Sequence, residues 1–343
     1  MNRQRTGILA AGVWIVDVSK RINHWPEPQT LAIIDQVIST NGGAAFNVAC
    51  DLKKLDADLL VEGAGLIGED APGAYILETC RHFGIDASRL STTSTHPTSF
   101  TDVMTERGSG RRTFFHLPGT NALFNESHLE LTPCHAKIFF MGYLGLLAAM
   151  DACDASGRNP SSRVFEEASR LGMLTAADLV SAPNEHLAAQ VCPCLPHLDI
   201  LLTNEWEAAR LTGRSLAAGD NVTFGAAMAL AKEVLALGVR GSVVLHFAHG
   251  AVLVSADGKQ FAQSAVHVPK NEVVGTTGAG DAFAAGFLLG THHGMTPQES
   301  LELAVCSAAT SLHAITCSDS IRPWEECLSY GRSMGFQPTD FLS

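Results

Sequence analysis

The stretch Gly275-Thr276-Thr277-Gly278-Ala279-Gly280-Asp281 near the C-terminus says more about the fold than any other part of the sequence. The apolar run that follows it, AFAAGFLLG, predicts a helix, so the Gly-Ala-Gly turn is expected at a helix N-terminus. Small residues in such a turn let a phosphate approach the backbone. The exposed N–H groups and the positive end of the helix dipole then stabilise anionic oxygen. The stretch therefore predicts an anion hole formed by Gly278, Ala279 and Gly280.

Asp281 follows this turn directly. A carboxylate beside a bound anion is electrostatically unfavourable unless it has a function. The function that fits is to accept a proton from a substrate hydroxyl while that oxygen attacks a phosphoryl group. The alternative is a Gly-rich turn in which Asp281 only caps the helix. For the full seven-residue arrangement we favour the functional interpretation.

Two other predicted helices begin with residues suited to ligand binding. Gly42 and Gly43 precede a helix at a point where a backbone can come close to a ligand, and Asn47 lies one turn along. The Asn amide both donates and accepts, as sugar hydroxyls require, although a Gly-rich turn with a capping Asn explains the pattern equally well. Asn204 and Glu207 open another helix, and taken alone they are more typical of a solvated helix start.

Apolar strands alternate with amphipathic stretches over most of the chain, which is typical of β-α-β organisation. Strands are predicted at residues 7–12, 59–64, 137–142, 200–203, 242–247 and 252–254. Helices are predicted at residues 44–55, 74–83, 224–237 and 296–314, the last opening with a capping box. Two segments, about 14–40 and 95–123, break this rhythm with β-branched stretches that no helix follows. They predict a small accessory sheet.

Composition excludes several classes of function. The chain has 343 residues, 46% of them hydrophobic and 17% charged, with a net charge of −12. Such a surface repels nucleic acid and anionic membranes, and the longest apolar run is too short to span a bilayer. The N-terminus has no long apolar core of a signal peptide. Nine scattered cysteines, with only Cys192 and Cys194 close together, indicate free thiols in the cytoplasm.

The sequence GTTGAGD resembles the C-terminal signature of the ribokinase-like (PfkB-type) carbohydrate kinases, usually Asp-Thr-x-Gly-Ala-Gly-Asp. Three other stretches resemble motifs of that family in the right order. Residues 41–47 resemble Gly-Gly-x-x-x-Asn, residues 65–70 resemble Gly-x-x-Gly-x-Asp, and residues 204–207 resemble Asn-x-x-Glu. The resemblance covers nearly the whole chain.

This resemblance implies a single α/β domain over residues 1–343. Its fold is a three-layer α/β/α arrangement with a mostly parallel central sheet and a small β-sheet lid. It also implies phosphorylation of a sugar hydroxyl by ATP, with Asp281 as general base. The sugar would be held by Asp17, Gly42, Gly43 and Asn47. The nucleotide would contact Asn204, Thr276 and Gly250, and Glu207 with Asn204 would organise Mg²⁺ through water.

The sequence departs from the family pattern in two places. Gly275 stands where the family usually has an Asp that helps to hold a monovalent cation, so we expect weak or absent potassium activation. Leu245 and Phe247 replace the Thr and first Gly of the family's Thr-x-Gly-x-x-Gly loop, which lines the nucleotide site. The neighbouring His246 and His249 are candidates for phosphate contacts, although a His in such a loop is more often a surface group.

Several interpretations remain open from the sequence. A nucleoside kinase would need an aromatic slot, for which Trp14, Trp25 and Phe115 are candidates. These residues and Phe114 are alternatively apolar cover in the lid, or ordinary packing. A catalytically silent sugar-binding protein would explain the altered nucleotide loop but not the intact GAGD.

Two further features of the lid bear on partners. Arg111, Arg112 and His116 either bind an acidic group on the substrate or form a solvated turn. Lid strands in the family often pair between subunits, which favours a homodimer.

Overall fold

The computed structural model describes residues 5–108, 111–182, 184–216 and 222–338. Within these ranges the centre of the molecule is a nine-stranded sheet in the order β13-β12-β11-β10-β9-β8-β1-β4-β5. Pairing is parallel from β11 to β5, whereas β12 is antiparallel to both β11 and β13. The strands are β1 (Ile8–Gly12), β4 (Val61–Gly68), β5 (Asp86–Thr93), β8 (Ile138–Leu144), β9 (Leu174–Leu179), β10 (Ile200–Asn204), β11 (Ser242–Phe247), β12 (Gly250–Ser255) and β13 (Gln260–Ser264).

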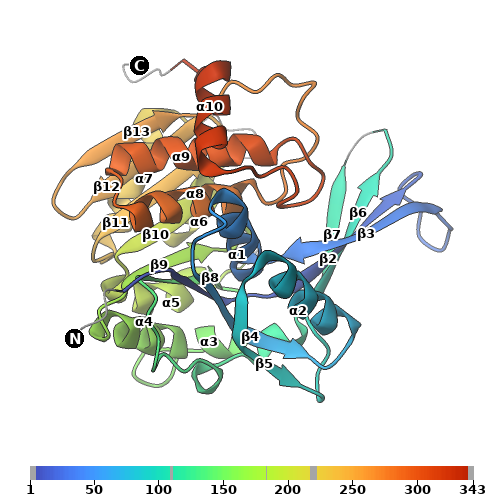
Figure 1. Ribbon diagram of the computed structural model, residues 1–343, viewed down its shortest axis with the longest axis horizontal. Coiled ribbons are helices and arrows are strands. Elements are labelled where there is room, and N and C mark those ends of the chain that lie inside the picture. The colour runs from blue at the N-terminus through green and yellow to red at the C-terminus, as the bar shows by residue number, and fades with distance from the viewer. Residues whose placement is uncertain (1–4, 109–110, 183, 217–221, 339–343) are drawn as a thin grey trace.

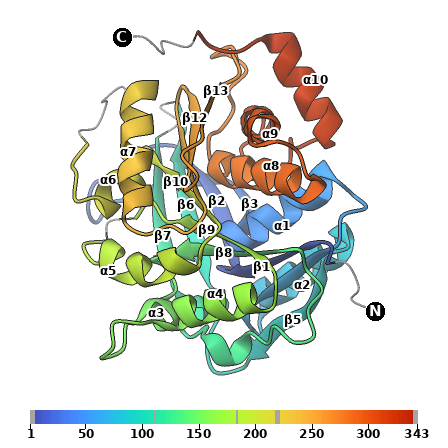
Figure 2. The same ribbon diagram turned by 90° about the vertical axis from the view of Figure 1, so that its left-hand side faces the viewer.

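Helices cover both faces of this sheet, which gives three layers (Figures 1 and 2). Alternation along the strands explains the two cores. In β1, Ile8 and Ala10 belong to one hydrophobic cluster, and Leu9 and Ala11 to the other. The first face carries α1 (Ala44–Leu55), α2 (Ala71–Phe83), α8 (Ala279–His293) and α9 (Pro297–Ser311), with α10 (Trp324–Met334) outside them. The second carries α3 (Ala148–Asp151), α4 (Pro160–Arg170), α5 (Leu187–Val191), α6 (Glu205–Leu211) and α7 (Phe224–Ala236). The expected three-layer fold is confirmed.

A second sheet of four strands projects from one side of the body, as Figure 1 shows. Its order is β3-β2-β6-β7, and its strands are β2 (Ile15–Ile22), β3 (Ile34–Gly42), β6 (Phe100–Glu106) and β7 (Arg112–Leu117). Thr40, Asp17, Thr101 and His116 stand in register across the four strands. Since directly paired residues share a face, this row and every second row from it face the same side.

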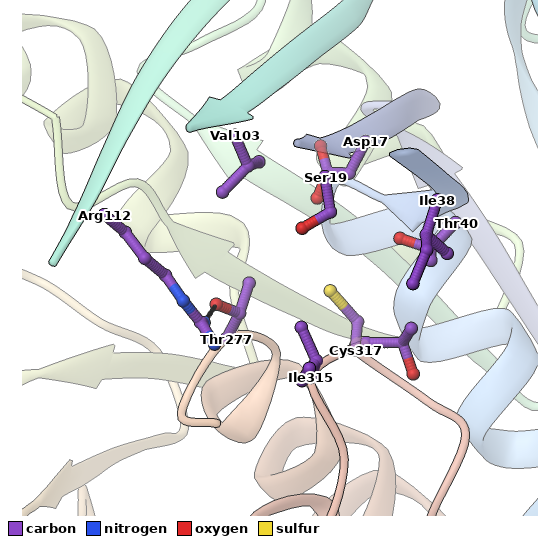
Figure 3. Close-up of a pocket in the computed structure, with 10 residues that line it drawn as sticks. Asp17, Ser19, Ile38, Thr40, Val103, Arg112, Thr277, Ile315 and Cys317 are labelled. Carbon is purple, nitrogen blue, oxygen red and sulfur yellow. Dashed lines mark hydrogen bonds between the residues drawn. The ribbon is translucent and has the colours of Figure 1, made fainter. Parts of the chain in front are cut away.

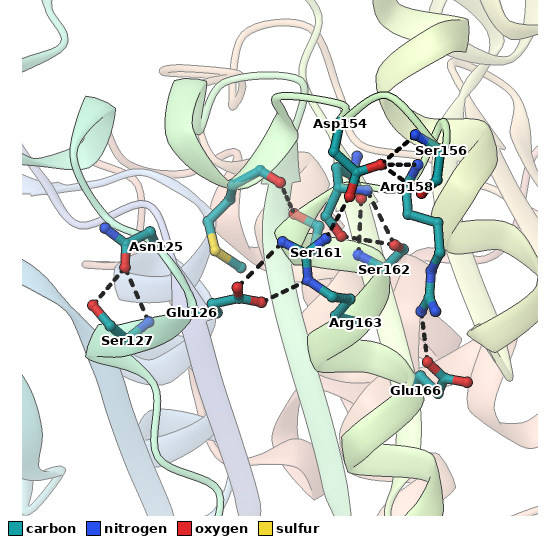
Figure 4. Close-up of polar contacts among 12 residues, drawn as sticks. Asn125, Glu126, Ser127, Asp154, Ser156, Arg158, Ser161, Ser162, Arg163 and Glu166 are labelled. Carbon is teal, nitrogen blue, oxygen red and sulfur yellow. Dashed lines mark hydrogen bonds and ion pairs between the residues drawn. The ribbon is translucent and has the colours of Figure 1, made fainter.

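Local capping patterns set the ends of the helices. In α9, Thr296 and Glu299 form the predicted capping box, with Pro297 at the first helical position. Asn159 caps α4 in the same way, and Arg163 on that helix bonds to both Glu126 and Asp154 (Figure 4). These surface ion pairs each contribute about 0–1 kcal/mol, so they fix loop positions more than they stabilise the fold.

The described residues contain no helix that is both long and apolar enough to cross a bilayer. All nine cysteines lie within the described ranges as free thiols. Seven of them are buried, Cys192 is half-buried and Cys153 is exposed.

Candidate active site

The carboxyl ends of the parallel strands meet at one edge of the central sheet, where ligands bind in open α/β folds. Polar residues stand at the end of four of these strands: Tyr143 on β8, Asp178 on β9, Asn204 on β10 and His246 on β11. The N-termini of α1, α6 and α8 lie at the same edge because each follows a strand or loop that ends there. This edge therefore brings together residues that are far apart in the sequence.

The GTTGAGD stretch forms the predicted turn at the start of α8. Gly278 is the N-cap residue, with a φ of 80°, a left-handed conformation that favours glycine. A Cβ atom at Gly278 would lie 2.7 Å from the Cβ atom of Cys317, so the turn is also tightly packed. The first N–H groups of α8 have no partners within the helix, which is the usual setting for anion binding, and that of Ala279 donates to the Thr276 carbonyl at 3.3 Å.

Asp281 lies in the first turn of α8 and is only 4% exposed. Its carboxylate accepts hydrogen bonds from Asn47 Nδ2 at 2.8 Å and from the Tyr143 hydroxyl at 2.7 and 2.9 Å. Burial raises the pKa of Asp281 above its ordinary value, and the two hydrogen bonds oppose that rise. Asp281 is therefore a buried carboxylate that two hydrogen-bond donors hold in place at the N-terminus of α8.

A chain of amides orients Asn47. Its Oδ1 atom accepts from Asn41 Nδ2 at 2.7 Å, and the same Nδ2 group donates to Ser318 Oγ at 2.8 Å. Because Oδ1 is taken, the Asn47 amide must present its N–H group to Asp281. The helix α1 and the start of α8 are thereby joined through the candidate base.

Asp17 lies on the face of the smaller sheet that looks into the site. Burial raises its pKa to about 7, the Thr101 hydroxyl opposes this, and the nearby Asp281 adds to it. A Cβ atom at Gly42 would collide with the Asp17 carboxylate, so a larger residue there would displace the Asp17 side chain. Asp17, Gly42 and Asn47 thus lie near Asp281, as the resemblance implied. Gly43 caps α1 with a φ of 80°.

A cavity opens beside Asp17 (Figure 3). The smaller sheet contributes Asp17, Ser19 and Arg112 to its wall, and the C-terminal part of the chain contributes Thr277 and Cys317. Arg112 Nη1 donates to Thr277 Oγ1, a contact between the smaller sheet and the GTTGAGD turn. The cavity therefore lies between the smaller sheet and two loops of the main body, at residue 277 and at residues 315–317.

Asn204 and Glu207 form a capping box at the start of α6. The Glu207 carboxylate is 3% exposed and accepts hydrogen bonds from the Asn204 N–H group at 2.9 Å and from Ser181 Oγ at 2.6 Å. Asp178 is buried nearby, and its pKa is raised first by burial and then by the charges of Glu207 and Asp281. A line of three carboxylates therefore runs along this edge, and a cation would relieve their mutual repulsion.

The residues that replace the family's nucleotide loop do not line the site. The side chains of Leu245 and Phe247 are buried in the second core, where Phe247 packs on Phe224. His246, between them, faces the other way and lies about 3.5 Å from where a Cβ atom of Gly280 would be. Burial lowers its pKa to about 4, so a neutral imidazole stands beside the first turn of α8.

The other candidates for nucleotide contacts differ in exposure, since Gly250 is buried whereas Thr276 and His249 are exposed. Thr276 is exposed in the turn before α8, and Gly250 opens β12 where the chain passes close to Gln263. His249 is exposed and its Nδ1 atom lies 3.1 Å from Gln337 Oε1.

The expectation that Trp14 covers the substrate or forms an aromatic slot is wrong. Its ring is fully buried on Phe46, and its Nε1 group donates to the Ala64 carbonyl at 2.9 Å. Trp25 and Phe115 stack on each other with centroids 6.3 Å apart. The register places Phe115 on the face of the smaller sheet opposite Asp17, so these rings do not line the cavity.

Sequence reasoning missed Tyr143, Asp178 and Cys317. Each belongs to the site only because the fold brings it there, and none lies in one of the motifs quoted above. The one available signal was position: Tyr143 and Asp178 are polar residues at the ends of apolar strands, where parallel strands present their ligand-binding edge.

Known proteins resemble this chain in sequence and in fold. The sequence model of the pfkB family of carbohydrate kinases matches residues 11–325. Ribokinase of Schizosaccharomyces pombe is 27% identical over 284 residues, which are 79% of this chain and 80% of the relative. The structure of Arabidopsis thaliana ribokinase complexed with ribose and ATP aligns with a TM-score of 0.76 at 22% identity, covering 95% of this chain and 98% of that one.

A nucleoside kinase of Methanocaldococcus jannaschii aligns with a TM-score of 0.74 at 18% identity, covering 96% of this chain and 99% of that one. At these identities the two solved structures show the fold, whereas the family match extends over most of the chain. The chain therefore belongs to the pfkB family of carbohydrate kinases.

Proposed function

We propose that this kinase transfers a phosphoryl group from ATP to a hydroxyl of a sugar or sugar-like molecule. The observation that carries the proposal is the position of Asp281, a buried carboxylate in the first turn of α8 with Asp17 and the cavity beside it. A hydroxyl bound between Asp17 and Asn47 would lie within reach of Asp281. That carboxylate accepts the proton as the hydroxyl oxygen attacks the phosphoryl group.

The remaining residues of the site divide between phosphate and metal. The N–H groups of Gly278, Ala279 and Gly280 stabilise charge on the transferred group. Glu207 and Asn204, with Asp178, would organise Mg²⁺, which neutralises phosphate charge when bound. Among the described residues no cluster of three metal-ligating side chains is close enough to hold an ion. Mg²⁺ usually keeps several waters and binds through one or two carboxylates and the substrate phosphates, so Glu207 and Asn204 would hold it through water.

The smaller sheet acts as a lid in this proposal. Arg112 and Thr277, which both line the cavity, connect the smaller sheet to the GTTGAGD turn. A kinase needs such a cover because water would otherwise compete with the acceptor hydroxyl.

The direct test is ADP release from ATP and Mg²⁺ across a panel of sugars, sugar acids, sugar phosphates and nucleosides. We expect a signal that depends on one class of sugar-like acceptor. A signal with nucleosides alone would mean that the acceptor is a nucleoside. Measurable sugar binding without any ADP release would instead indicate a catalytically silent binding protein.

The pH dependence of the reaction is expected to report Asp281. Its carboxylate is the working form, so kcat/KM falls as pH decreases through its raised pKa. Burial and the neighbouring Asp281 charge hold the pKa of Tyr143 well above its ordinary value, so its hydroxyl remains a donor. Tyr143→Phe removes a bond that favours the charged carboxylate, so the acid limb moves to higher pH, by about one unit.

Asp17 also ionises in this pH range, because its pKa is about 7. Both proteins share the ionisation of Asp17, so the difference between Tyr143→Phe and wild type reports the shift at Asp281. At a pH above the acid limbs of both proteins, Tyr143→Phe should keep most of the wild-type activity. An acid limb at the same pH in both proteins would contradict the role of Tyr143.

Potassium is not expected to activate this enzyme. Gly275 offers no carboxylate, and a Cβ atom at that position would lie 3.0 Å from Arg112 Nη2. A guanidinium this close repels a monovalent cation, so the residues do not fit one. Rates of ADP release in potassium chloride and choline chloride should agree within about twofold. A several-fold increase with potassium would show this expectation to be wrong.

The protein is also proposed to form a homodimer through its smaller sheet. Large apolar side chains lie exposed on and beside its strands: Ile33, Ile34, Val37, Phe114 and Phe115, each at least 45% exposed. Pairing of two such sheets would remove this surface from water. Light scattering that gives the mass of one chain at micromolar concentration would contradict the dimer.

A further inference from the structure

We propose that the acceptor carries an anionic group, a carboxylate or a phosphate, which Arg112 binds at the end of the cavity away from Asp17. This inference rests on the proposed kinase function and narrows its substrate class. It is carried by the position of Arg112, by the pairing of the other cations around it, and by the glycine at position 275.

Arg112 and Asp17 share one face of the smaller sheet. Arg112 pairs with Thr105, which pairs with Arg21, and Arg21 is four residues from Asp17 on β2. An even separation places the two side chains on the same side, and four strand residues span roughly 13 Å. Figure 3 shows them on opposite sides of the cavity, with Arg112 reaching toward Thr277. A sugar held at Asp17 would extend toward the guanidinium.

Arg112 is the one Lys or Arg among the residues that line this cavity. In the described part of the chain it has no carboxylate within ion-pair distance, and its guanidinium donates to the neutral Thr277 hydroxyl. The other cations of the smaller sheet differ in this respect. They pair as Lys20 with Asp102, Arg21 and Arg107 with Asp35, and Arg111 with Glu106. These four cations are thus paired with carboxylates, whereas Arg112 lines the cavity without a carboxylate partner among the described residues.

Gly275 leaves the charge of the Arg112 guanidinium available to a ligand. A Cβ atom there would lie 3.0 Å from Arg112 Nη2, so an acidic side chain at this position would pair with the guanidinium and neutralise it. With glycine, the guanidinium retains donors for an external acid. Its planar fork matches a carboxylate or a phosphate with two parallel hydrogen bonds. A half-buried guanidinium without a counter-charge is unfavourable, and an anionic ligand is the group that relieves it.

The test compares acceptors that differ chiefly in the anion: gluconate with glucitol, which are both open chains, and ribose 5-phosphate with ribose. Wild type, Arg112→Ala, Arg112→Lys and Arg111→Ala are measured with each pair. Arg111→Ala is the matched control, because it removes the same charge from the adjacent residue, whose partner is Glu106. A preference for gluconate would identify the anion as a carboxylate, and a preference for ribose 5-phosphate would identify it as a phosphate.

We expect wild type to prefer the anionic member of one pair, and Arg112→Ala to lose roughly 100-fold in kcat/KM for that member, mostly through KM. The neutral member should lose much less, because it loses only the contact between Arg112 and Thr277 and no charge pairing. The kcat/KM of Arg112→Lys for the anionic member should lie between those of wild type and Arg112→Ala, because Lys keeps the charge but lacks the planar guanidinium. Arg111→Ala should behave as wild type. Thermal melting of each variant establishes that the fold is intact.

Two results would overturn the inference: a preference for neutral acceptors, or an equal loss for neutral and anionic acceptors in Arg112→Ala. Either would leave the kinase function standing, provided that ADP release still depends on Asp281. Absence of ADP release with every acceptor is a separate failure, that of the proposed function, and it would remove the inference with it.

Discussion

Asp281→Asn is expected to lower kcat by about 10³-fold while Mg²⁺-ATP binding remains near wild type. The variant keeps the shape of the side chain and its hydrogen bond from Tyr143, but an amide cannot accept the proton of the attacking hydroxyl. Replacing a buried carboxylate whose pKa is raised by burial also removes an unfavourable charge. The fold should therefore be as stable as wild type or slightly more stable. ADP release measures the rate, and calorimetric titration measures nucleotide binding.

Asp199→Asn is the control for this substitution. Asp199 lies just before β10, at the opposite end of the central sheet, where it pairs with Arg240. The same chemical change there should leave kcat within about twofold of wild type. Retention of more than a tenth of the wild-type kcat by Asp281→Asn would show that another group accepts the proton.

The sequence predicts the parts of this site that depend on local geometry. A glycine at a helix N-terminus and a polar residue one turn into a helix are signals contained within a few residues, as at Gly278 and Asn47. Once the strands are predicted to be parallel, their carboxyl ends must share one edge, so the two motifs are expected to meet. The hydrogen bond from Asn47 Nδ2 to Asp281 is the structural result of that expectation.

Residues that act through long-range contacts are not visible in the same way. Tyr143 and Asp178 reach the site only because β8 and β9 pair with each other and with their neighbours. Trp14 shows the reverse case: an aromatic residue in a predicted lid segment is buried at 0% exposure, because β2 begins only at Ile15. Whether an aromatic side chain packs inside or covers a ligand depends on its partners, which its own sequence neighbourhood does not give.

Missed elements have a similar cause. The edge strands β5 and β13 contain many polar residues, since an edge strand is covered less than a central one. The helix α4 was missed although Asn159 and Pro160 form a helix start that sequence patterns describe.

Gly278→Ala is expected to lower kcat by about 100-fold and also to reduce stability. Two costs act at this position. A φ of 80° costs an L-residue about 1–2 kcal/mol, and the new Cβ atom would lie 2.7 Å from that of Cys317, so the turn must move. Movement of this turn displaces the N–H groups of the anion hole, which act only at a fixed distance from the transferred phosphoryl group.

Gly258→Ala separates these two costs. Gly258 has a φ of 84°, and a Cβ atom there meets nothing within 4 Å, so the substitution carries the backbone cost without the collision. It lies in the turn between β12 and β13, whose residues take no part in the proposed chemistry. Both variants should melt earlier than wild type, but only Gly278→Ala should lose kcat. Equal kcat in the two variants would mean that the turn before α8 contributes to the fold and not to the transition state.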